Sequence, residues 1–276
     1  AAGNKCHLIS VIGNDDNAKI LREMCKKTQG LTFDLIVDKT RCTTNKQRFV
    51  SGNQQILRVD SESKEYICNK IEDNIFELFL KKLKHVNVVI ISDYKKGMVT
   101  KNLLKKIIRT CRAKKKTVII DPKDKDFSIY ANAHIITPNQ KELFEAIEPD
   151  LNASDNSVEK LSKKIIKLHG FDTVITTRSS DGITLVDKSH KTLHLPSRAK
   201  EVFDVSGAGD TVVSYIASGI VRNFSLIECV KQANEAAGIA VGRFGTTTVS
   251  REEIENRNNI NLKICRLSEL IKQIRI

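Results

Sequence analysis

Apolar runs and amphipathic stretches alternate along most of this chain. The apolar run at 7–12 is followed by Asp15 and Asp16, good N-cap residues for a helix that continues to Lys27 and ends before Gly30. The same alternation predicts further strands at 87–92, 117–120 and 173–177, and further helices at 101–113 and 158–168. Buried apolar strands separated by amphipathic helices imply a mostly parallel sheet covered on both faces. The predicted fold class is therefore α/β and doubly wound.

One stretch breaks this alternation. Three short strand-like runs, at 33–37, 46–50 and 54–59, follow one another with no helix between them, and Ser51-Gly52-Asn53 suits a hairpin turn. An antiparallel insertion of this kind in a doubly wound protein often forms a flap over a site, although a plain surface hairpin is the alternative. We therefore predict a small antiparallel β lid at about 31–60.

The last third of the chain is predicted to be helical, at 209–221, at 226–242 and in a short segment from Arg251. A length of 276 residues suits one large α/β domain with a small appendage. We place that domain at 1–258 and a C-terminal tail or linker at 259–276.

Charge and cysteine content narrow the classes of partner. The chain has 46 basic and 33 acidic residues, a net charge of +13, which would suit nucleic acid, an anionic membrane or phosphorylated small molecules. The lysines are scattered over helix faces, without zinc-finger spacing or interleaved aromatics, so we expect no nucleic-acid partner. Apolar runs are too short to cross a bilayer, so no membrane partner is expected. Seven cysteines without CxxC spacing indicate reduced thiols and a cytoplasmic protein.

The segment Asp204-Val205-Ser206-Gly207-Ala208-Gly209-Asp210 carries the strongest chemical signal, because it leads directly into the predicted helix. Its two glycines allow a tight turn and close approach of a ligand, and the amides of a helix N-terminus bind anions. Phosphoryl transfer needs such a cradle, together with a carboxylate that accepts the proton of the attacking hydroxyl. Asp210 is placed for that role. The alternative is an acidic residue that only starts a helix after an ordinary glycine loop.

A second signal is Thr137-Pro138-Asn139-Gln140-Lys141-Glu142. An amide oxygen and a carboxylate three residues apart suit a hard cation that keeps several water ligands. Asn139 and Glu142 also have the spacing of a capping box, so an N-capped helix is the alternative.

These two segments together resemble the signature of the ribokinase-like (PfkB) sugar kinases. Other segments resemble the D-glycero-β-D-manno-heptose 7-phosphate kinases within that group, and the likeness extends over roughly 1–258. They are Ser92–Gly97, Asp121-Pro122-Lys123 with Asp126-Phe127 and Tyr130, Asn53-Gln54-Gln55 with Arg58 and Asp60, Thr177-Arg178 with Gly182, and the segment from Gly242 to Val249.

The resemblance implies an ATP-dependent kinase that needs Mg²⁺. ATP would phosphorylate the anomeric hydroxyl of heptose 7-phosphate and give the 1,7-bisphosphate, for ADP-heptose and lipopolysaccharide core biosynthesis. Asp210 would be the base, and the amides of Gly207, Ala208 and Gly209 the anion hole. Mg²⁺ would lie near Asn139 and Glu142, and K⁺ near Asp204 and Ser206.

The resemblance also assigns further residues to the two ligands. The nucleotide would contact Gln140, Lys141, Thr177, Gly182, Asn234 and Gly245. The phosphosugar would contact Lys46, Arg48, Asp93, Lys96 and Lys123, and for each basic residue a plain surface role is the alternative. Lid strands would pair across a homodimer and cover their exposed edges.

The sequence differs from the family pattern in two features. Members of the family begin with a strand and a Gly-Gly segment that supply sugar-binding side chains, whereas Ala1-Ala2-Gly3 matches a point just after them, so we expect part of the lid to be missing. The His-x-Gly-His motif of a nucleotidyltransferase is absent from the sequence, so no nucleotidyl transfer is expected. Two alternatives stay open, another PfkB-type sugar kinase or a truncated nucleotide-binding protein without kinase activity.

Overall fold

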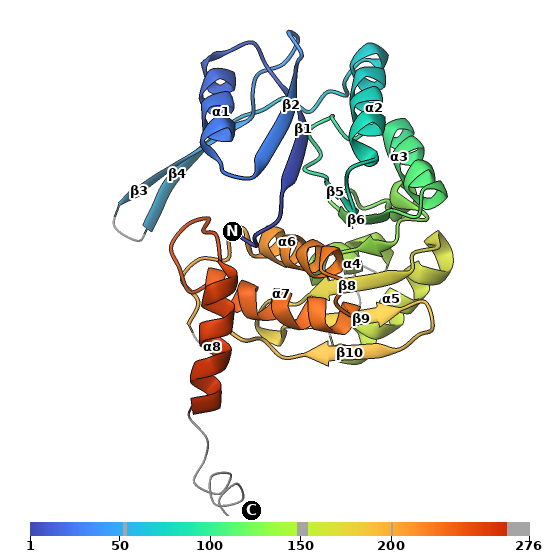
Figure 1. The fold of residues 1–276 in the computed structure, drawn as a ribbon, viewed down its shortest axis with the longest axis vertical. Coiled ribbons are helices and arrows are strands. Elements are labelled where there is room, and N and C mark those ends of the chain that lie inside the picture. The colour runs from blue at the N-terminus through green and yellow to red at the C-terminus, as the bar shows by residue number, and fades with distance from the viewer. Residues whose placement is uncertain (52–53, 148–153, 200, 264–276) are drawn as a thin grey trace, which may run out of the picture. The chain divides into compact units, whose positions relative to one another are not determined.

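The computed structural model describes residues 1–51, 54–147, 154–199 and 201–263. The chain divides into two compact units. The larger unit comprises residues 5–176 and 184–193, and the smaller unit comprises residues 1–4, 177–183 and 194–276. Figure 1 labels the elements of both.

The larger unit begins with a β-α-β segment. Strands β1 (Cys6–Ile12) and β2 (Leu31–Val37) pair in parallel, and helix α1 (Asp16–Lys27) connects them. Helix α1 begins where the Asp15 side chain accepts the Ala18 N–H at 2.9 Å, as the N-cap preference predicts. A small core between the helix and the two strands contains Ile12, Ala18, Cys25 and Leu35. The first run of the predicted lid stretch thus pairs with β1, because its buried positions face α1.

Strands β3 (Asn45–Ser51) and β4 (Gln54–Ser61) form a separate antiparallel ribbon, as predicted from the two later runs. Gly52 and Asn53 of the predicted turn lie outside the described residues. The ribbon extends away from α1 and β2 (Figure 1). It exposes five large apolar side chains, Phe49, Val50, Ile56, Leu57 and Val59. Isolated two-stranded ribbons are marginally stable in water, and an exposed apolar patch of this kind is typical of interaction surfaces.

A six-stranded sheet follows, in the spatial order β10-β9-β8-β7-β6-β5. Its strands are β5 (Val88–Ser92), β6 (Thr117–Asp121), β7 (Ile135–Ile136), β8 (Thr173–Thr177), β9 (Ile183–Asp187) and β10 (Thr192–Leu195). Strands β5 to β8 run parallel, which confirms the predicted α/β class with a mostly parallel sheet and a small antiparallel one.

Helices of the larger unit pack with this sheet around one apolar core. They are α2 (Asn69–Leu83), α3 (Lys101–Ala113), α4 (Gln140–Ile147), α5 (Asp155–His169) and the short 3₁₀ helix η1 (Phe127–Tyr130). Helix α3 has the predicted bounds, because Thr100 caps it and apolar residues repeat along one face. Helix α2 was not among the predicted helices, although Ile71, Ile75 and Phe79 recur at intervals of four.

The smaller unit is mainly helical, with α6 (Ala208–Val221), α7 (Leu226–Ala240) and α8 (Arg251–Lys263), and it also contains the 3₁₀ turn η2 (Ser179–Asp181). Helix α6 lies so close to α7 that a Cβ on Gly219 would meet the Cys229 Sγ at 2.5 Å. Of the predicted tail at 259–276, residues 259–263 belong to α8 and residues 264–276 lie outside the described part. Among the described residues, no helix combines the length and the apolar character needed to span a membrane.

Candidate active site

The start of helix α6 is the centre of the site in the smaller unit. Gly207 is the N-cap residue, with φ +79° and ψ 5°, and no side chain caps the helix there. L-residues rarely adopt this left-handed conformation, so glycine is required for the turn. The Thr211 N–H donates to the Gly207 carbonyl at 2.9 Å and closes the first turn. Gly209 and Asp210 are exposed in this turn. A helix start without a side-chain cap is the arrangement that anion sites use; here the Ala208 N–H donates to the Val205 carbonyl at 3.2 Å.

Asp204 organises the loop before that helix. Its Oδ1 accepts the Ser206 N–H at 2.8 Å, and its Oδ2 accepts the Gly245 N–H at 3.1 Å. Its own N–H donates to the Val241 carbonyl at 3.2 Å. The carboxylate therefore ties the loop before α6 to the segment after α7. This places Asp204, Ser206 and Gly245 together, three of the residues that the sequence singled out.

Another part of the smaller unit joins the turn after β8 to helix α7. At Gly182, φ is +87° and a Cβ would lie 2.0 Å from the Leu195 carbonyl oxygen, so glycine alone fits. Asn234 is buried, and its side-chain amide donates to the Pro196 carbonyl at 2.8 Å. Thr177 ends β8 directly before this turn. The structure thus gives Asn234 and Gly182 a role in holding the segment around Pro196.

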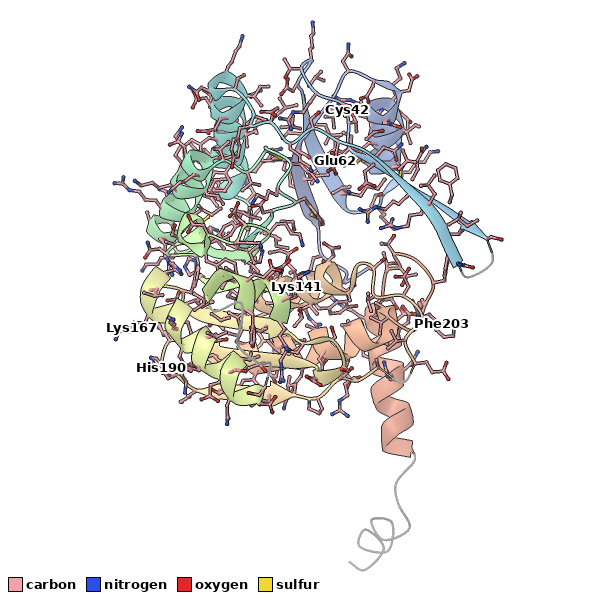
Figure 2. All side chains as sticks on the ribbon, turned by 180° about the vertical axis from the view of Figure 1, so that it is seen from behind. Cys42, Glu62, Lys141, Lys167, His190 and Phe203 are labelled. Atoms are coloured by element: carbon pink, nitrogen blue, oxygen red, sulfur yellow. The ribbon has the colours of Figure 1, made fainter. Side chains whose placement is uncertain are left out.

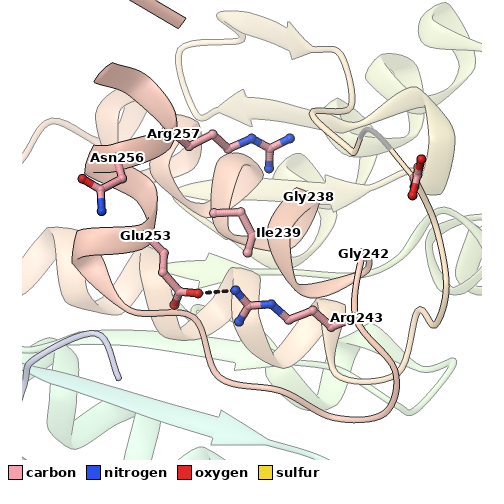
Figure 3. A pocket seen from close by; sticks show the side chains of 8 residues that line it. Gly238, Ile239, Gly242, Arg243, Glu253, Asn256 and Arg257 are labelled. Carbon is pink, nitrogen blue, oxygen red and sulfur yellow. Dashed lines mark hydrogen bonds and ion pairs between the residues drawn. The ribbon is translucent and has the colours of Figure 1, made fainter. Parts of the chain in front are cut away.

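A cavity of about 530 Å³ lies between helices α7 and α8 of the same unit. Gly238, Ile239 and Gly242 line one side, and Glu253 pairs with Arg243 across it (Figure 3). This volume is within the range of small-molecule sites. The cavity therefore offers mixed polar and backbone contacts beside the helix that carries Asn234.

The start of helix α4, in the larger unit, holds the second group of candidates. Asn139 and Glu142 form a reciprocal pair, in which the Asn139 N–H donates to Glu142 Oε2 at 3.0 Å and the Glu142 N–H to Asn139 Oδ1 at 2.9 Å. Glu142 Oε1 accepts from the Lys123 ammonium group at 2.9 Å. This hydrogen bond raises the pKa of Lys123. The structure thus brings Lys123 to the predicted cation-binding pair and shows the capping interaction that was the alternative.

These two side chains fit a magnesium ion that keeps much of its water. Each carboxylate or amide oxygen has two lone pairs, and the bonds of the capping pair use one of them on each oxygen. Within the described part of the chain, no cluster of three or more His, Cys, Asp or Glu side chains could enclose a metal. Proteins commonly hold Mg²⁺ through one or two carboxylates plus phosphate oxygens and water, and the remaining lone pairs of Asn139 and Glu142 are compatible with such a site. Helix α4 begins with Gln140 and Lys141, of which Figure 2 labels Lys141. The Lys141 ammonium lies 3.8 Å from a carboxylate oxygen of Glu145.

A charged cluster joins the base of the ribbon to the loop after β5. The Lys46 ammonium lies 3.0 Å from both Asp60 and Glu62, and the Lys96 ammonium lies 2.5 Å from Glu62. Lys96 and then Lys46 hold the pKa of Glu62 below its ordinary value, and the two carboxylates raise the pKa of Lys46. Figure 2 labels Glu62 at this position. Two of the predicted phosphosugar residues are therefore neighbours, with carboxylate partners between them.

The other two sugar candidates differ in exposure. Arg48 is exposed on β3 and lies opposite Arg58 in the ribbon register. Asp93 is buried, its Oδ1 accepts the Lys95 N–H at 2.7 Å, and its Oδ2 accepts the Tyr130 hydroxyl at 2.6 Å. Asp93 thus orders the loop after β5 through hydrogen bonds inside the protein.

Two residues of this region were missed from the sequence as site residues. Arg58, Asp60 and Glu62 occupy every second position, so Glu62 extends the row of charged residues on one face of β4. This spacing of two residues could have identified Glu62 from the sequence. Arg41 is paired with Asp38 and donates to the carbonyl groups of Lys96 and Glu65. No sequence pattern identifies Arg41 as a site residue, because its hydrogen bonds go to backbone carbonyls that are distant in the sequence.

Comparison with known proteins identifies the family. The model of the pfkB family of carbohydrate kinases matches residues 1–253. Over 254 residues, 92% of this chain, the sequence is 38% identical to a bifunctional protein HldE of Paramagnetospirillum magneticum, of which it covers 52%. It is 37% identical over 277 residues, 98% of the chain, to a bifunctional protein HldE of Campylobacter fetus, of which it covers 59%. The chain thus spans about half the length of these relatives.

Solved structures show the same fold at low sequence identity. Phosphofructokinase-2 of Escherichia coli in complex with potassium has a TM-score of 0.77 and 18% identity, over 92% of this chain and 81% of that one. Ribokinase of Giardia lamblia has a TM-score of 0.77 and 18% identity, over 92% of this chain and 83% of that one. The family match over nearly the whole described chain settles the class, and the chain belongs to the pfkB family of carbohydrate kinases.

Proposed function

We propose that this chain phosphorylates D-glycero-β-D-manno-heptose 7-phosphate at its anomeric hydroxyl, with ATP as the donor. The observation that carries the proposal is the glycine turn with φ +79° at Gly207, which opens a helix start to an anion next to an exposed Asp210. The resemblance of segments such as Ser92–Gly97 to the heptose 7-phosphate kinases, together with 37–38% identity to HldE proteins, favours a heptose substrate. The product would be heptose 1,7-bisphosphate, a precursor for ADP-heptose and lipopolysaccharide core biosynthesis.

In this mechanism Asp210 accepts the proton of the anomeric hydroxyl as its oxygen attacks the γ-phosphorus of ATP. The bond between that phosphorus and the oxygen bridging to the β-phosphorus breaks, and ADP leaves. The amides of Gly207 and Gly209 at the start of α6 stabilise the charge on the transferred group, together with that of Ala208, whose N–H donates to the Val205 carbonyl at 3.2 Å when no ligand is bound. Asn139 and Glu142 would hold Mg²⁺, which would neutralise charge on the nucleotide phosphates when it is bound. Asp204 and the Ser206 carbonyl would hold a monovalent cation.

We place the nucleoside end of ATP against helix α7. Asn234, Gly182 and Gly245 border this region, and a cavity of about 530 Å³ lies along the same helix. The sugar phosphate would approach the lysines of the larger unit, Lys46, Lys96 and Lys123, with Arg48 beside Lys46 on β3. A phosphate dianion there would take the place of the carboxylates that now pair with these lysines.

The exposed apolar surface of the ribbon supports a second copy of this chain as a partner. Phe49 lies opposite Leu57 in the register, and the side chains of both are more than half exposed, at 51% and 53%. A homodimer through the ribbons would remove these side chains from water and cover strand edges.

The test is release of ADP by the chain with Mg-ATP, compared among heptose 7-phosphate, ribose and fructose 6-phosphate. Turnover with heptose 7-phosphate alone is expected. Asp210→Asn should keep nucleotide binding and lose most turnover, by a factor of about 10² to 10⁴ for a lost general base. A variant with near-normal turnover would remove Asp210 from the base role. Turnover with another sugar alone would leave a different sugar kinase, and ATP binding without any turnover would leave a nucleotide-binding protein.

A further inference from the structure

Tyr130 is a fully buried residue between the two lysine-bearing loops of the larger unit. It ends the short helix η1, its relative exposure is 0%, and its ring packs edge-on against Phe127 at 6.2 Å between centroids. Its hydroxyl group is the polar end of an otherwise apolar side chain. Burial and the hydrogen bond to Asp93 raise the pKa of this phenol, so it stays protonated and donates.

The hydroxyl uses its full hydrogen-bonding capacity, which is one donor and two acceptor positions. It donates to Asp93 Oδ2 at 2.6 Å. It accepts the N–H of Lys123 at 3.3 Å and the N–H of Asp124 at 3.1 Å. One oxygen atom thus joins the loop that follows β5 to the turn that follows β6.

Both loops lead from this hydroxyl to charged groups of the candidate site. On one side, the other oxygen of Asp93 accepts the Lys95 N–H at 2.7 Å, in the loop that also carries Lys96. On the other side, the Lys123 ammonium lies 2.9 Å from Glu142, the partner of Asn139. Direct contacts therefore run from Asp93 through Tyr130 and Lys123 to the residues proposed to hold magnesium.

We infer that Tyr130 is a positioning residue for the Mg-ATP part of this site, and that it acts through the backbone of Lys123. This inference rests on the proposed function, because it takes Glu142 and Asn139 as contacts of the nucleotide's metal ion and Lys123 as the residue that holds Glu142 in place. Tyr130 itself touches no substrate. Its hydroxyl holds the amides of residues 123 and 124, and this sets the direction in which the Lys123 side chain leaves the turn toward Glu142.

The substitution that tests this is Tyr130→Phe, which keeps the buried ring and removes only the oxygen. Two backbone N–H groups and one buried carboxylate oxygen then lose a partner, and the turn can relax. We expect the Kd for Mg-ATP, measured by calorimetry, to rise about tenfold, the change that corresponds to about 1.4 kcal/mol. We also expect faster hydrogen exchange at the amides of residues 123 and 124, with the exchange of β6 and β7 unchanged.

A matched control separates positioning from lost stability. Arg112→Met removes the hydrogen bonds to the Asn132 and Ala133 carbonyls before β7 and the ion pair with Asp172 before β8, at the opposite, amino-terminal ends of these strands. It should lower the melting temperature without changing the Kd for Mg-ATP. If Tyr130→Phe lowers the melting temperature equally and leaves that Kd unchanged, the hydroxyl has only a structural role and the inference is overturned.

A double-mutant cycle tests whether the effect passes through Lys123. Lys123→Met alone should also weaken Mg-ATP binding, and Tyr130→Phe should add nothing to it in the double variant. Fully additive losses would overturn the stated route. Binding of Mg-ATP needs no sugar, so failure to phosphorylate heptose 7-phosphate would refute the proposed substrate and leave this test intact. A wild-type chain that does not bind Mg-ATP would refute both.

Discussion

Gly207 and Gly209, the two glycines at the start of α6, are predicted to have opposite effects when each is changed to alanine. At Gly207 the added Cβ would lie 3.4 Å from Thr246 Cγ2, an ordinary contact, so space is not limiting. The constraint is φ, which is +79°. At Gly209 the backbone is helical and nothing lies within 4 Å of the added Cβ. The first glycine is thus required for conformation, and the second leaves room for a ligand.

These differences set the expected changes in the free energy of unfolding. A left-handed alanine costs about 1–2 kcal/mol, and the lower entropy of the unfolded chain returns about 0.4–1 kcal/mol. Gly207→Ala should therefore destabilise the fold by about 1 kcal/mol. Alanine is better than glycine in a helix by about 0.5–1 kcal/mol, so Gly209→Ala should stabilise it by up to that amount. In a chain of this size such changes move the melting temperature by about 2–4 °C.

Gly209→Ala, the variant expected to be more stable than the wild type, should have much lower turnover. The methyl group of Gly209→Ala would occupy the space through which a phosphate reaches the first amides of α6. Removing one oxyanion donor typically costs about 10²–10³ in kcat, and we expect a loss of this size. Thermal unfolding and coupled ADP release would measure the two quantities on the same samples. Ser214→Ala, an exposed position on the same helix, is the matched control and should gain stability without losing turnover.

Two results would refute this reasoning. If Gly209→Ala keeps wild-type turnover, the first amides of α6 do not bind the transferred phosphoryl group. If Gly207→Ala is as stable as the wild type, the left-handed turn is not required by the fold. A Gly209→Ala variant that is both more stable and much less active would show that this glycine is needed for ligand access and not for folding.

Three further predictions concern the larger unit. Gly97→Ala should destabilise the fold by about 3 kcal/mol or more, as urea unfolding would show, because φ is +76° and the Cβ would lie 1.8 Å from a backbone carbonyl oxygen; normal stability would contradict this. Burial and then Arg112 lower the pKa of His134, whose ring accepts a backbone N–H of β6. The unfolded chain therefore binds more protons below about pH 6.5, and the free energy of unfolding should fall as the pH falls from that value. In urea unfolding between pH 5 and 7, His134→Gln should make the free energy of unfolding less dependent on pH, whereas the control His190→Asn, at an exposed position, should not. If His134→Gln shows the same pH dependence as the wild type, the prediction is refuted. A double change of Phe49 and Leu57 to Glu should convert a ribbon dimer to monomers in light scattering, and a wild-type monomer would exclude that dimer.

Much of the local structure could be predicted because it depends on nearby residues. Helix α3 has the predicted bounds, and α1 begins at the predicted cap. The ribbon was predicted from its two strand-like runs and the turn residues between them. The left-handed turn at Gly207 agrees with the expected need for glycine before α6. Each of these features follows from residues that are close together in the sequence.

Contacts between residues distant in the sequence could not be predicted in this way. The resemblance to heptose kinases includes Tyr130 in the segment that begins at Asp121. No pattern in the sequence indicates that its hydroxyl contacts Asp93, 37 positions earlier. The pairing of Glu62 with Lys96 depends on how the ribbon base meets the loop after β5. Such pairs are set by the register and packing of whole elements, whereas local patterns specify only the elements themselves.

The Asn139–Glu142 pair shows why two interpretations of one spacing can both be compatible with a structure. The capping bonds direct the amide oxygen and the carboxylate toward each other's backbone N–H groups, and Lys123 takes the other carboxylate oxygen. These bonds leave lone pairs on each oxygen and hold both side chains at the start of the helix. A water-rich magnesium site requires few protein ligands, but it benefits from ligands already held in place. Capping the helix would therefore prepare the same two side chains for a cation, and spacing alone cannot separate the two roles because the same atoms would perform both.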